Sequence, residues 1–358
     1  MRYISIDVLR TIAIAIMVIV HFVENLSGLG HYVPGGFAAP LFSFLVGVSY
    51  RLWMRGLEEK GKSDAEISKI SVRRGLFLIG VGFAFNIFVW MPEDVFNWDV
   101  LTFLGSALVF LNVVRKMPGP IPIVLCVLIY VLSPLLRNTA QYTTFWTSGY
   151  FDPEMTLSDV TLGYLVTGYF PIFPWLIFPV MGYVVAAAFF PPGQRGEQAE
   201  GRLLATGIVL MVIGAALTAA SYFGWITIPW LKGWTMFPAS PAYVAGTLGI
   251  AITSLIVAHR WLDSEKPAEE AMVSRIASTF SRHSFSVYLL HHFVHIWPLW
   301  IYGVATMNDA TYYWQKAMEA TISWPLALLF LVLCYFFLRW MDDVRLPGIE
   351  SLMRWLCD

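Results

Sequence analysis

Apolar and polar residues follow one another along this chain in long blocks, and many apolar blocks are long enough to cross a membrane. About 20 consecutive apolar residues in a helix span the hydrocarbon core of a bilayer. The pattern predicts ten such helices, over residues 4–23, 37–54, 74–91, 100–114, 120–136, 169–190, 203–223, 242–259, 284–304 and 322–339. We therefore expect an all-α, polytopic membrane helical bundle in which residues 1–358 form a single integral membrane domain.

The composition leads to the same class of protein. Hydrophobic residues make up 58% of the chain and charged residues 13%, whereas soluble domains carry about 25% charge. The formal net charge of -1 gives no basic signal for a nucleic-acid partner, so membrane lipids are the expected surroundings. The three cysteines share no spacing typical of metal ligands, and we expect no metal.

The distribution of Lys and Arg predicts the orientation. If the ten helices alternate in direction, only Arg10, Arg137, Lys232 and Lys316 lie away from one side, which leaves 19 of the 23 cations there. Cytoplasmic loops carry such an excess. Both termini are therefore expected in the cytoplasm, with the protein in a plasma (inner) membrane. The opposite loops, above all residues 137–168, are rich in aromatic residues that suit either sugar stacking or anchoring at the interface.

The first predicted helix carries three ionisable residues on one face. Asp7 and Arg10 are one i,i+3 step apart, and His21 follows Arg10 after about three full turns, on the order of 16 Å along the axis. Ionisable groups inside a membrane are expensive and commonly face a site or a cavity. Asp7 and Arg10 can also neutralise each other, which is a purely structural explanation. His21, Asn25 and His31 lie toward the outer end, where a histidine can act as a general base.

A late helix carries the densest group of histidines. Ser284, Tyr288, His291 and His295 recur at spacings that share one helix face, and His292 is expected to point away from it. His291 and His295 have the i,i+4 spacing of metal or haem ligands, but no acidic partner accompanies them. We favour a polar wall of a substrate or cofactor cavity over a metal or haem site.

Two arginines open the third predicted helix. Arg73 and Arg74 form a pair that is usually a topological anchor at a membrane edge. The alternative is a clamp for a phosphorylated ligand, formed with Arg10, Arg51 and Arg282. Asn86 lies further along the same apolar run.

An ordered set of motifs resembles the transmembrane acyltransferases. The spacing of Arg10 and His21 is similar to that in the acyltransferase-3 family. The remaining motifs resemble the heparan-alpha-glucosaminide N-acetyltransferase family and its bacterial and archaeal relatives. They are Asp7 with Arg10, Pro40–Ser49, Arg73–Asn86, Phe173-Pro174-Trp175 with Gly182-Tyr183, and Ser284–His291. Thr11 departs from the family pattern, which has Gly there; its hydroxyl is able to form a hydrogen bond.

The resemblance implies a membrane enzyme that takes acetyl groups from cytosolic acetyl-CoA and passes them to an amino sugar or another glycan amine or hydroxyl at the outer side. His31 matches the outer-loop histidine proposed as catalytic in the heparan branch, whereas His21 matches the acyltransferase-3 histidine. The catalytic candidates are His31, His21, Asp7 and Asn25; the candidates that bind the donor are Arg10, Arg73, Arg74, Asn86, Arg282, Ser284, Tyr288 and His291.

Two other classes of function stay open at this point. The polar faces of the first and ninth helices also suit a transporter or channel, although the chain has no inverted repeat. The histidines of the ninth helix also suit a haem or quinone redox protein. The sequence does not identify the acceptor, the acyl chain length, the catalytic histidine, or whether an acyl-enzyme forms; relatives suggest a homodimer.

Overall fold

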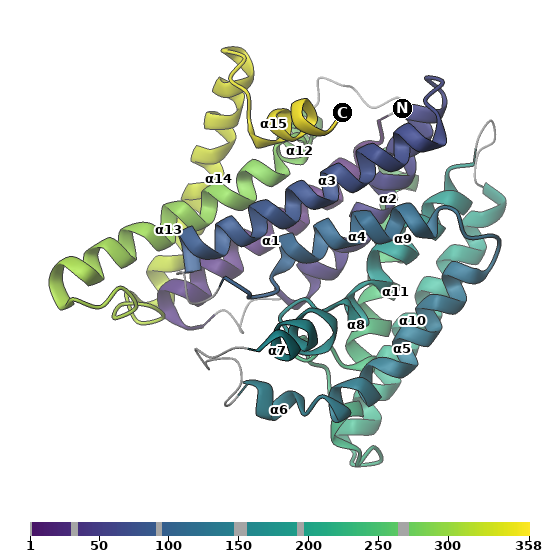
Figure 1. Ribbon diagram of the computed structural model, residues 1–358, viewed down its shortest axis with the longest axis horizontal. Coiled ribbons are helices and arrows are strands. Elements are labelled where there is room, and N and C mark those ends of the chain that lie inside the picture. The colour runs from purple at the N-terminus through teal and green to yellow at the C-terminus, as the bar shows by residue number, and fades with distance from the viewer. Residues whose placement is uncertain (1, 30–34, 91–94, 147–155, 192–196, 264–271) are drawn as a thin grey trace. The chain divides into compact units, whose positions relative to one another are not determined.

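The computed structural model describes residues 2–29, 35–90, 95–146, 156–191, 197–263 and 272–358 (Figure 1). These residues form helices and connecting turns, and their one antiparallel bridge, between Met236 and Ala239, stands outside any strand. The predicted all-helical class is therefore confirmed.

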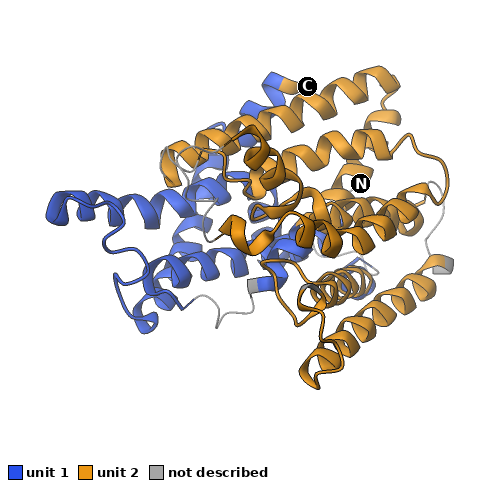
Figure 2. Ribbon diagram, turned by 60° about the horizontal axis from the view of Figure 1, so that its bottom comes forward, with its two compact units in different colours: residues 1–42, 257–356, 358 blue, residues 43–256, 357 orange. Residues whose placement is uncertain are grey.

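The helices pack into two compact units (Figure 2). We call residues 1–42, 257–356 and 358 the terminal unit, and residues 43–256 with 357 the central unit. That both belong to one catalytic domain stays a prediction.

The terminal unit is built around α1, the first helix. Its elements are α1 (Ile4–Ser27), η2 (Gly35–Phe37), α12 (Met272–Arg282), α13 (Ser284–Met307), α14 (Ala320–Asp343) and α15 (Ile349–Cys357). α1 contacts α12, α13 and α14. Ile14, Val18 and Phe22 form its apolar face and pack in one core with Phe330 and Leu338 of α14. The same core includes Phe280 of α12 and Val287 of α13, so the polar residues of α1 lie beside its apolar stripe, on the side that meets α12 and α13.

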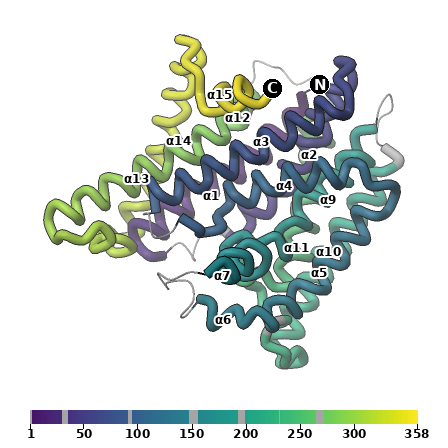
Figure 3. Tube along the Cα trace, in the orientation of Figure 1, coloured from purple at the N-terminus to yellow at the C-terminus, as the bar shows by residue number. Residues whose placement is uncertain are grey.

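The central unit holds the remaining helices. They are α2 (Ala38–Glu58), α3 (Asp64–Phe85), η3 (Asn86–Trp90), α4 (Val100–Val114), α5 (Ile121–Thr139), α6 (Tyr142–Thr144), α7 (Leu157–Leu162), η6 (Gly163–Thr167), α8 (Ile172–Trp175), α9 (Ile177–Phe189), α10 (Glu197–Tyr222), η7 (Pro229–Leu231) and α11 (Pro241–Leu262). The ends of α2 and α11 nearest the unit boundary belong to the terminal unit. α3 and α4 run side by side (Figure 3).

Seven helical segments of the described residues are long and apolar enough to cross a membrane. They are Ile4–Ser27, Asp64–Trp90, Ile121–Thr139, Leu157–Phe189, Ala199–Tyr222, Pro241–Leu262 and Ala320–Asp343. The other three predicted crossings are also helices, namely α2, α4 and α13. α4 has 15 residues, or about 22 Å of helix, short of a hydrocarbon core of about 30 Å. The histidines of α13 lower its mean hydropathy. The polytopic bundle is confirmed, while the count of ten and the cytoplasmic termini stay predictions.

The structure differs from the sequence analysis in the long segment predicted to be an outer loop, residues 137–168. We expected a loop there, but α7 and η6 make residues 157–167 helical. Thr156 and Asp159 form a capping box, in which each side chain accepts the backbone N–H of the other. Their Thr-x-x-Asp spacing is a helix-start signal that the aromatic composition of the segment obscured. Residues 147–155 lie outside the described part of the chain.

Glycines allow two pairs of helices in the central unit to approach backbone to backbone. A Cβ on Gly47 of α2 would overlap the carbonyl of Pro179 in α9, and a Cβ on Gly182 of α9 would overlap the carbonyl of Phe44. Gly75 and Gly105 make the same reciprocal contact between α3 and α4. Small residues at such crossings let membrane helices gain close van der Waals contact.

Gly47→Ala is expected to destabilise the protein by at least about 1–3 kcal/mol, because the new methyl group must push a backbone carbonyl aside. Thermal unfolding of the detergent-solubilised protein measures this. Gly56→Ala, nine residues further along the same helix with open space around it, is the matched control and should be neutral or slightly stabilising. Equal effects at both positions would contradict the close-packing argument.

Candidate active site

The polar face of α1 is directed at α12 and α13, so the ionisable residues predicted to share one stripe meet partners from the C-terminal part of the chain. Near the start of α1, Arg10 donates to the Ser281 hydroxyl of α12 at 2.5 Å. Asp7 is 7% exposed and accepts from the Arg2 guanidinium at 2.6 Å. Thr11 donates to the carbonyl of Asp7 and to that of Ala277, which confirms the hydrogen bond expected where the family has Gly.

The start of α1 is held by a carboxylate that is distant in sequence. Tyr3, the residue before the helix, supplies no side-chain cap. Instead, Asp263 accepts the backbone N–H of Ile4 at 2.8 Å and of Ser5 at 3.2 Å, and also the Ser5 hydroxyl. His259 lies 2.8 Å from the same carboxylate. A negative group at a helix N-terminus satisfies open N–H groups and complements the helix dipole.

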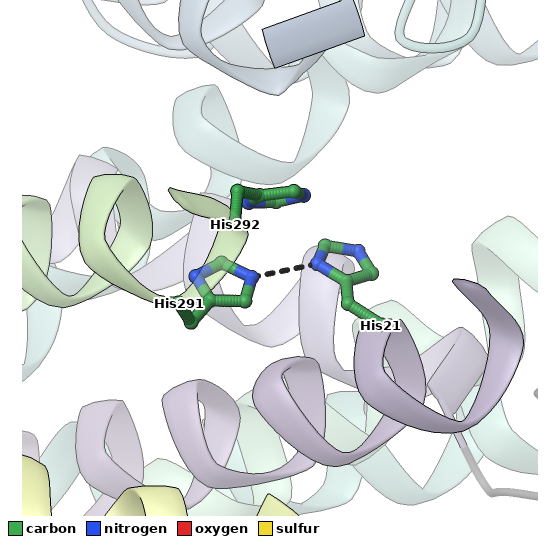
Figure 4. A group of neighbouring side chains, drawn as sticks. All are labelled: His21, His291 and His292. Atoms are coloured by element: carbon green, nitrogen blue, oxygen red, sulfur yellow. Dashed lines mark hydrogen bonds between the residues drawn. The ribbon is translucent and has the colours of Figure 1, made fainter. Parts of the chain in front are cut away.

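Three imidazoles meet near the other end of α1 (Figure 4). Nδ1 of His21 lies 2.9 Å from Nε2 of His291, and the two rings are stacked with centroids 5.1 Å apart. The ring centroid of His292 lies 4.7 Å from that of His21 and 4.0 Å from that of His291. His291 and His292 are fully buried, whereas His21 is only partly covered.

The helix backbone decides which nitrogen of each α13 histidine carries its hydrogen. Nδ1 of His291, His292 and His295 each faces the carbonyl oxygen four residues earlier. A carbonyl only accepts, so each Nδ1 must donate, and in a neutral ring Nε2 is then the acceptor. Nε2 of His291 therefore accepts from Nδ1–H of His21. This leaves the Nε2 lone pair of His21 as a proton acceptor.

Asn25 holds the C-terminal end of α1 against α13. Its amide nitrogen donates to Nε2 of His295 at 2.8 Å, in agreement with the tautomer that the backbone imposes. Its backbone carbonyl accepts from the N–H of Gln315 at 2.8 Å. The connection after α13 is thereby tied to the end of α1.

His292, expected to lie off the helix face that His291 and His295 share, nevertheless reaches the same group of side chains. One nitrogen from each of His21, His291 and His292 lies within 4.8 Å of the others. Successive helix positions are 100° apart, so both side chains reach His21 because it faces α13 between them. The three rings therefore form a group whose nitrogens are close enough to hold a metal ion.

The other donor-binding candidates of the terminal unit lie on α13 or at the end of α12. The Tyr288 ring lies against His291 and His292, with centroids 5.6 and 5.3 Å apart. Ser284 begins α13, two turns before His291. Arg282 pairs with Asp342 at 2.9 Å, so part of the charge predicted to bind the donor is already neutralised within the protein.

Three candidates belong to the central unit. Arg73 is exposed, and the Arg74 guanidinium lies over the Trp53 ring at 4.6 Å. The Asn86 amide nitrogen donates to the carbonyls of Val95 and Asn97, which uses both of its N–H groups to hold the connection before α4. That these residues join Arg10 at one ligand stays a prediction. His31 lies outside the described residues.

Sequence reasoning missed Ser281 and Asp263 as partners of α1 and did not name His292 as a candidate. Ser281 and Asp263 are about 260 residues or more from the groups they contact, and no local spacing signals such a contact. His292 had a visible signal, since two adjacent histidines in an apolar helix are costly side chains.

A comparison with protein families gave one match. The family described as heparan-alpha-glucosaminide N-acetyltransferase, catalytic, matches residues 2–217, which is more than half of the 358-residue chain. The match includes α1 with Asp7, Arg10, His21 and Asn25, but ends before α13. A comparison with curated proteins gave no match.

Asp263 provides a test of how α1 is held. Burial raises the pKa of Asp263, but hydrogen bonds from His259 and Ser5 outweigh this and leave the pKa below its ordinary value. Its contribution to stability is therefore complete above about pH 4 and is lost as the pH falls through the folded-state pKa. Asp263→Ala should cost about 1–2 kcal/mol at pH 7 by leaving the start of α1 uncapped.

Melting temperatures between pH 7 and pH 3.5 measure this effect. Asp263→Asn is the matched control, because it keeps an acceptor oxygen but cannot titrate. The difference between wild type and Asp263→Asn should shrink as the pH falls; a constant difference would show that the ionised carboxylate adds nothing.

Proposed function

The chain belongs to the heparan-alpha-glucosaminide N-acetyltransferase catalytic family and is a multi-pass membrane acetyltransferase. On that premise we propose that it transfers the acetyl group of cytosolic acetyl-CoA to an amino sugar, or to another glycan amine or hydroxyl, at the outer side of the membrane. The plasma (inner) membrane, cytoplasmic termini and a homodimer belong to the same proposal.

The observation that carries this proposal is the polar face of α1. It has a cationic end at Arg10, hydrogen-bonded to Ser281, and an imidazole end at His21, hydrogen-bonded to His291. The two ends are about 16 Å apart along the helix. A cation suits the phosphates of a nucleotide donor, and a neutral imidazole suits proton removal from an acceptor. One helix thus supplies both a cation for the donor phosphates and a base for the acceptor.

We assign the general base to His21. Its Nε2 lone pair accepts a proton from the acceptor amine or hydroxyl as the acceptor atom bonds to the thioester carbonyl carbon. The C–S bond then breaks, and the CoA thiolate leaves and takes up the proton that His21 received, which restores the basic Nε2. His291 holds the reactive tautomer by accepting Nδ1–H of His21. Asn25 has one further amide N–H beyond the one that His295 accepts, and this group is suited to stabilise the oxyanion.

We assign the binding of the acetyl-CoA donor to the cationic groups and to the polar residues of α13. Arg10, Arg73, Arg74 and Arg282 would bind the CoA phosphates, with Ser284, Tyr288 and His291 along the path of the pantetheine arm. Asn86 has the weakest claim among the candidates for binding acetyl-CoA, because its amide N–H groups already donate to the connection before α4. Asp7 is buried, lies one helical turn before Arg10 and pairs with Arg2. It would orient the cationic end of α1.

Acetyl-CoA is expected to raise the melting temperature of the detergent-solubilised protein and to donate radiolabelled acetyl groups to a glucosamine acceptor. Arg10→Gln should weaken acetyl-CoA binding by about tenfold or more, because a charge-assisted contact to phosphate is lost. Arg354→Gln, an exposed cation of α15, is the matched control and should bind normally. A protein that shows no shift with acetyl-CoA or CoA, but moves a solute across vesicles, would be a transporter.

The choice between the two histidines is testable by kinetics. His21→Gln should lower kcat by about 100-fold to 10,000-fold, the usual contribution of a general base, with little change in the KM for acetyl-CoA. His31→Ala, measured in parallel, should retain far more activity. The opposite ranking would assign the base to His31 and leave His21 with a structural role.

A further inference from the structure

The group formed by His21, His291 and His292 has the chemistry of a metal site as well as of a base. One nitrogen from each ring lies within 4.8 Å of the others. Two ligands come from adjacent residues of α13 and the third from α1, so the site is assembled only when these helices pack (Figure 4).

The backbone prepares two of the three ligands. His291 and His292 donate Nδ1–H to the carbonyls of Val287 and Tyr288 at 3.0 and 3.3 Å. Metal-bound histidines commonly donate their second nitrogen in this way, because it fixes the ring and leaves the other nitrogen with its lone pair. Packing in the helix pair therefore orders these two rings before any ion arrives.

We propose that His21, His291 and His292 bind one divalent first-row metal ion of the zinc class. Neutral imidazoles suit Zn²⁺, Cu²⁺ and Ni²⁺, and three protein ligands with an open fourth position form a common zinc arrangement. Zn–N bonds of about 2.0–2.1 Å place the ligand nitrogens about 3.4 Å apart in a tetrahedral site. The nitrogens of His21 and His291, now 2.9 Å apart in a hydrogen bond, must separate slightly.

Binding requires one proton to move. Nδ1 of His21 is the nitrogen directed at His291, so its hydrogen must pass to Nε2 before Nδ1 can bind the ion. The ring stays neutral, and no proton is released. A divalent ion among three neutral ligands carries charge into the membrane interior, which favours an anion at the fourth position, such as the hydroxide left when a bound water gives a proton to solvent.

This step links the metal to catalysis, and that link rests on the proposed function of His21. Once the hydrogen is on Nε2, His21 has no lone pair for the acceptor. Zinc is therefore expected to inhibit acetyl transfer, and removal of zinc to restore it. Metal binding itself does not depend on the enzymatic role.

The test uses the full chain, purified without a histidine tag and freed of metal by chelation and dialysis. Co²⁺ is added as a spectroscopic probe, and competition with Zn²⁺ gives the zinc affinity; elemental analysis after desalting gives the stoichiometry. We expect one ion per chain and the intense visible absorption of tetrahedral Co²⁺. His292→Gln and His21→Gln should each weaken binding by about 100-fold or more, beyond the usual effect of losing an outer partner.

His295→Gln is the matched control. His295 lies on the same helix and is equally buried, but Asn25 occupies its Nε2, so the variant should bind Co²⁺ as the wild type does. Wild-type protein that binds Co²⁺ no more tightly than His292→Gln, or only in an octahedral form, would overturn the proposal. Equal losses in His295→Gln and His292→Gln would also overturn it.

Activity separates this proposal from the proposed function. If metal-free protein transfers acetyl groups but binds no Co²⁺, the proposed metal site is wrong and the proposed function stands. If Co²⁺ binds as expected and zinc does not slow transfer, the metal site stands and His21 is not the base. If the ion binds and no acetyl-CoA binding is found, the proposed function is lost and the metal site stands.

Discussion

The hydrogen bond from His21 to His291 is the interaction on which the chemistry of the site depends. The α-helical backbone of α13 commits Nδ1 of His291 to the carbonyl of Val287, so its Nε2 must accept. Nδ1 of His21 must then donate, and its remaining nitrogen is left basic. A regular backbone thus determines the protonation pattern of a side chain on another helix, without any charged group taking part.

The same constraint explains why the polar face of α1 can be buried. A polar group in the membrane interior costs several kcal/mol unless it is hydrogen-bonded. Arg10 meets Ser281, His21 meets His291, and Asn25 meets His295. The apolar face of α1 packs on α14 at the same time. The apolar packing therefore lies directly beside the polar contacts and holds them in register, and the polar contacts select the rotation of the helix.

The fold and part of the site were readable from sequence because each depends on local periodicity. The apolar blocks gave the helices, and the step from Asp7 to Arg10 to His21 gave the polar face of α1. The sequence did not reveal that Asp263 caps α1, since the two lie about 260 residues apart. It also did not show that His292 meets His21, because the direction of a side chain on one helix has meaning only relative to the helix packed against it.

The sequence by itself determined the membrane class, the helices, the family and the polar face of α1, because hydropathy, helical spacing and motif order are properties of short stretches of chain. Only the tertiary structure decided which histidines meet, which nitrogen of each is basic, and which cations are already paired. Those properties depend on contacts between helices that begin some 280 residues apart, α1 and α13, and hydrogen bonds over about 3 Å cannot be inferred from a pattern along one helix.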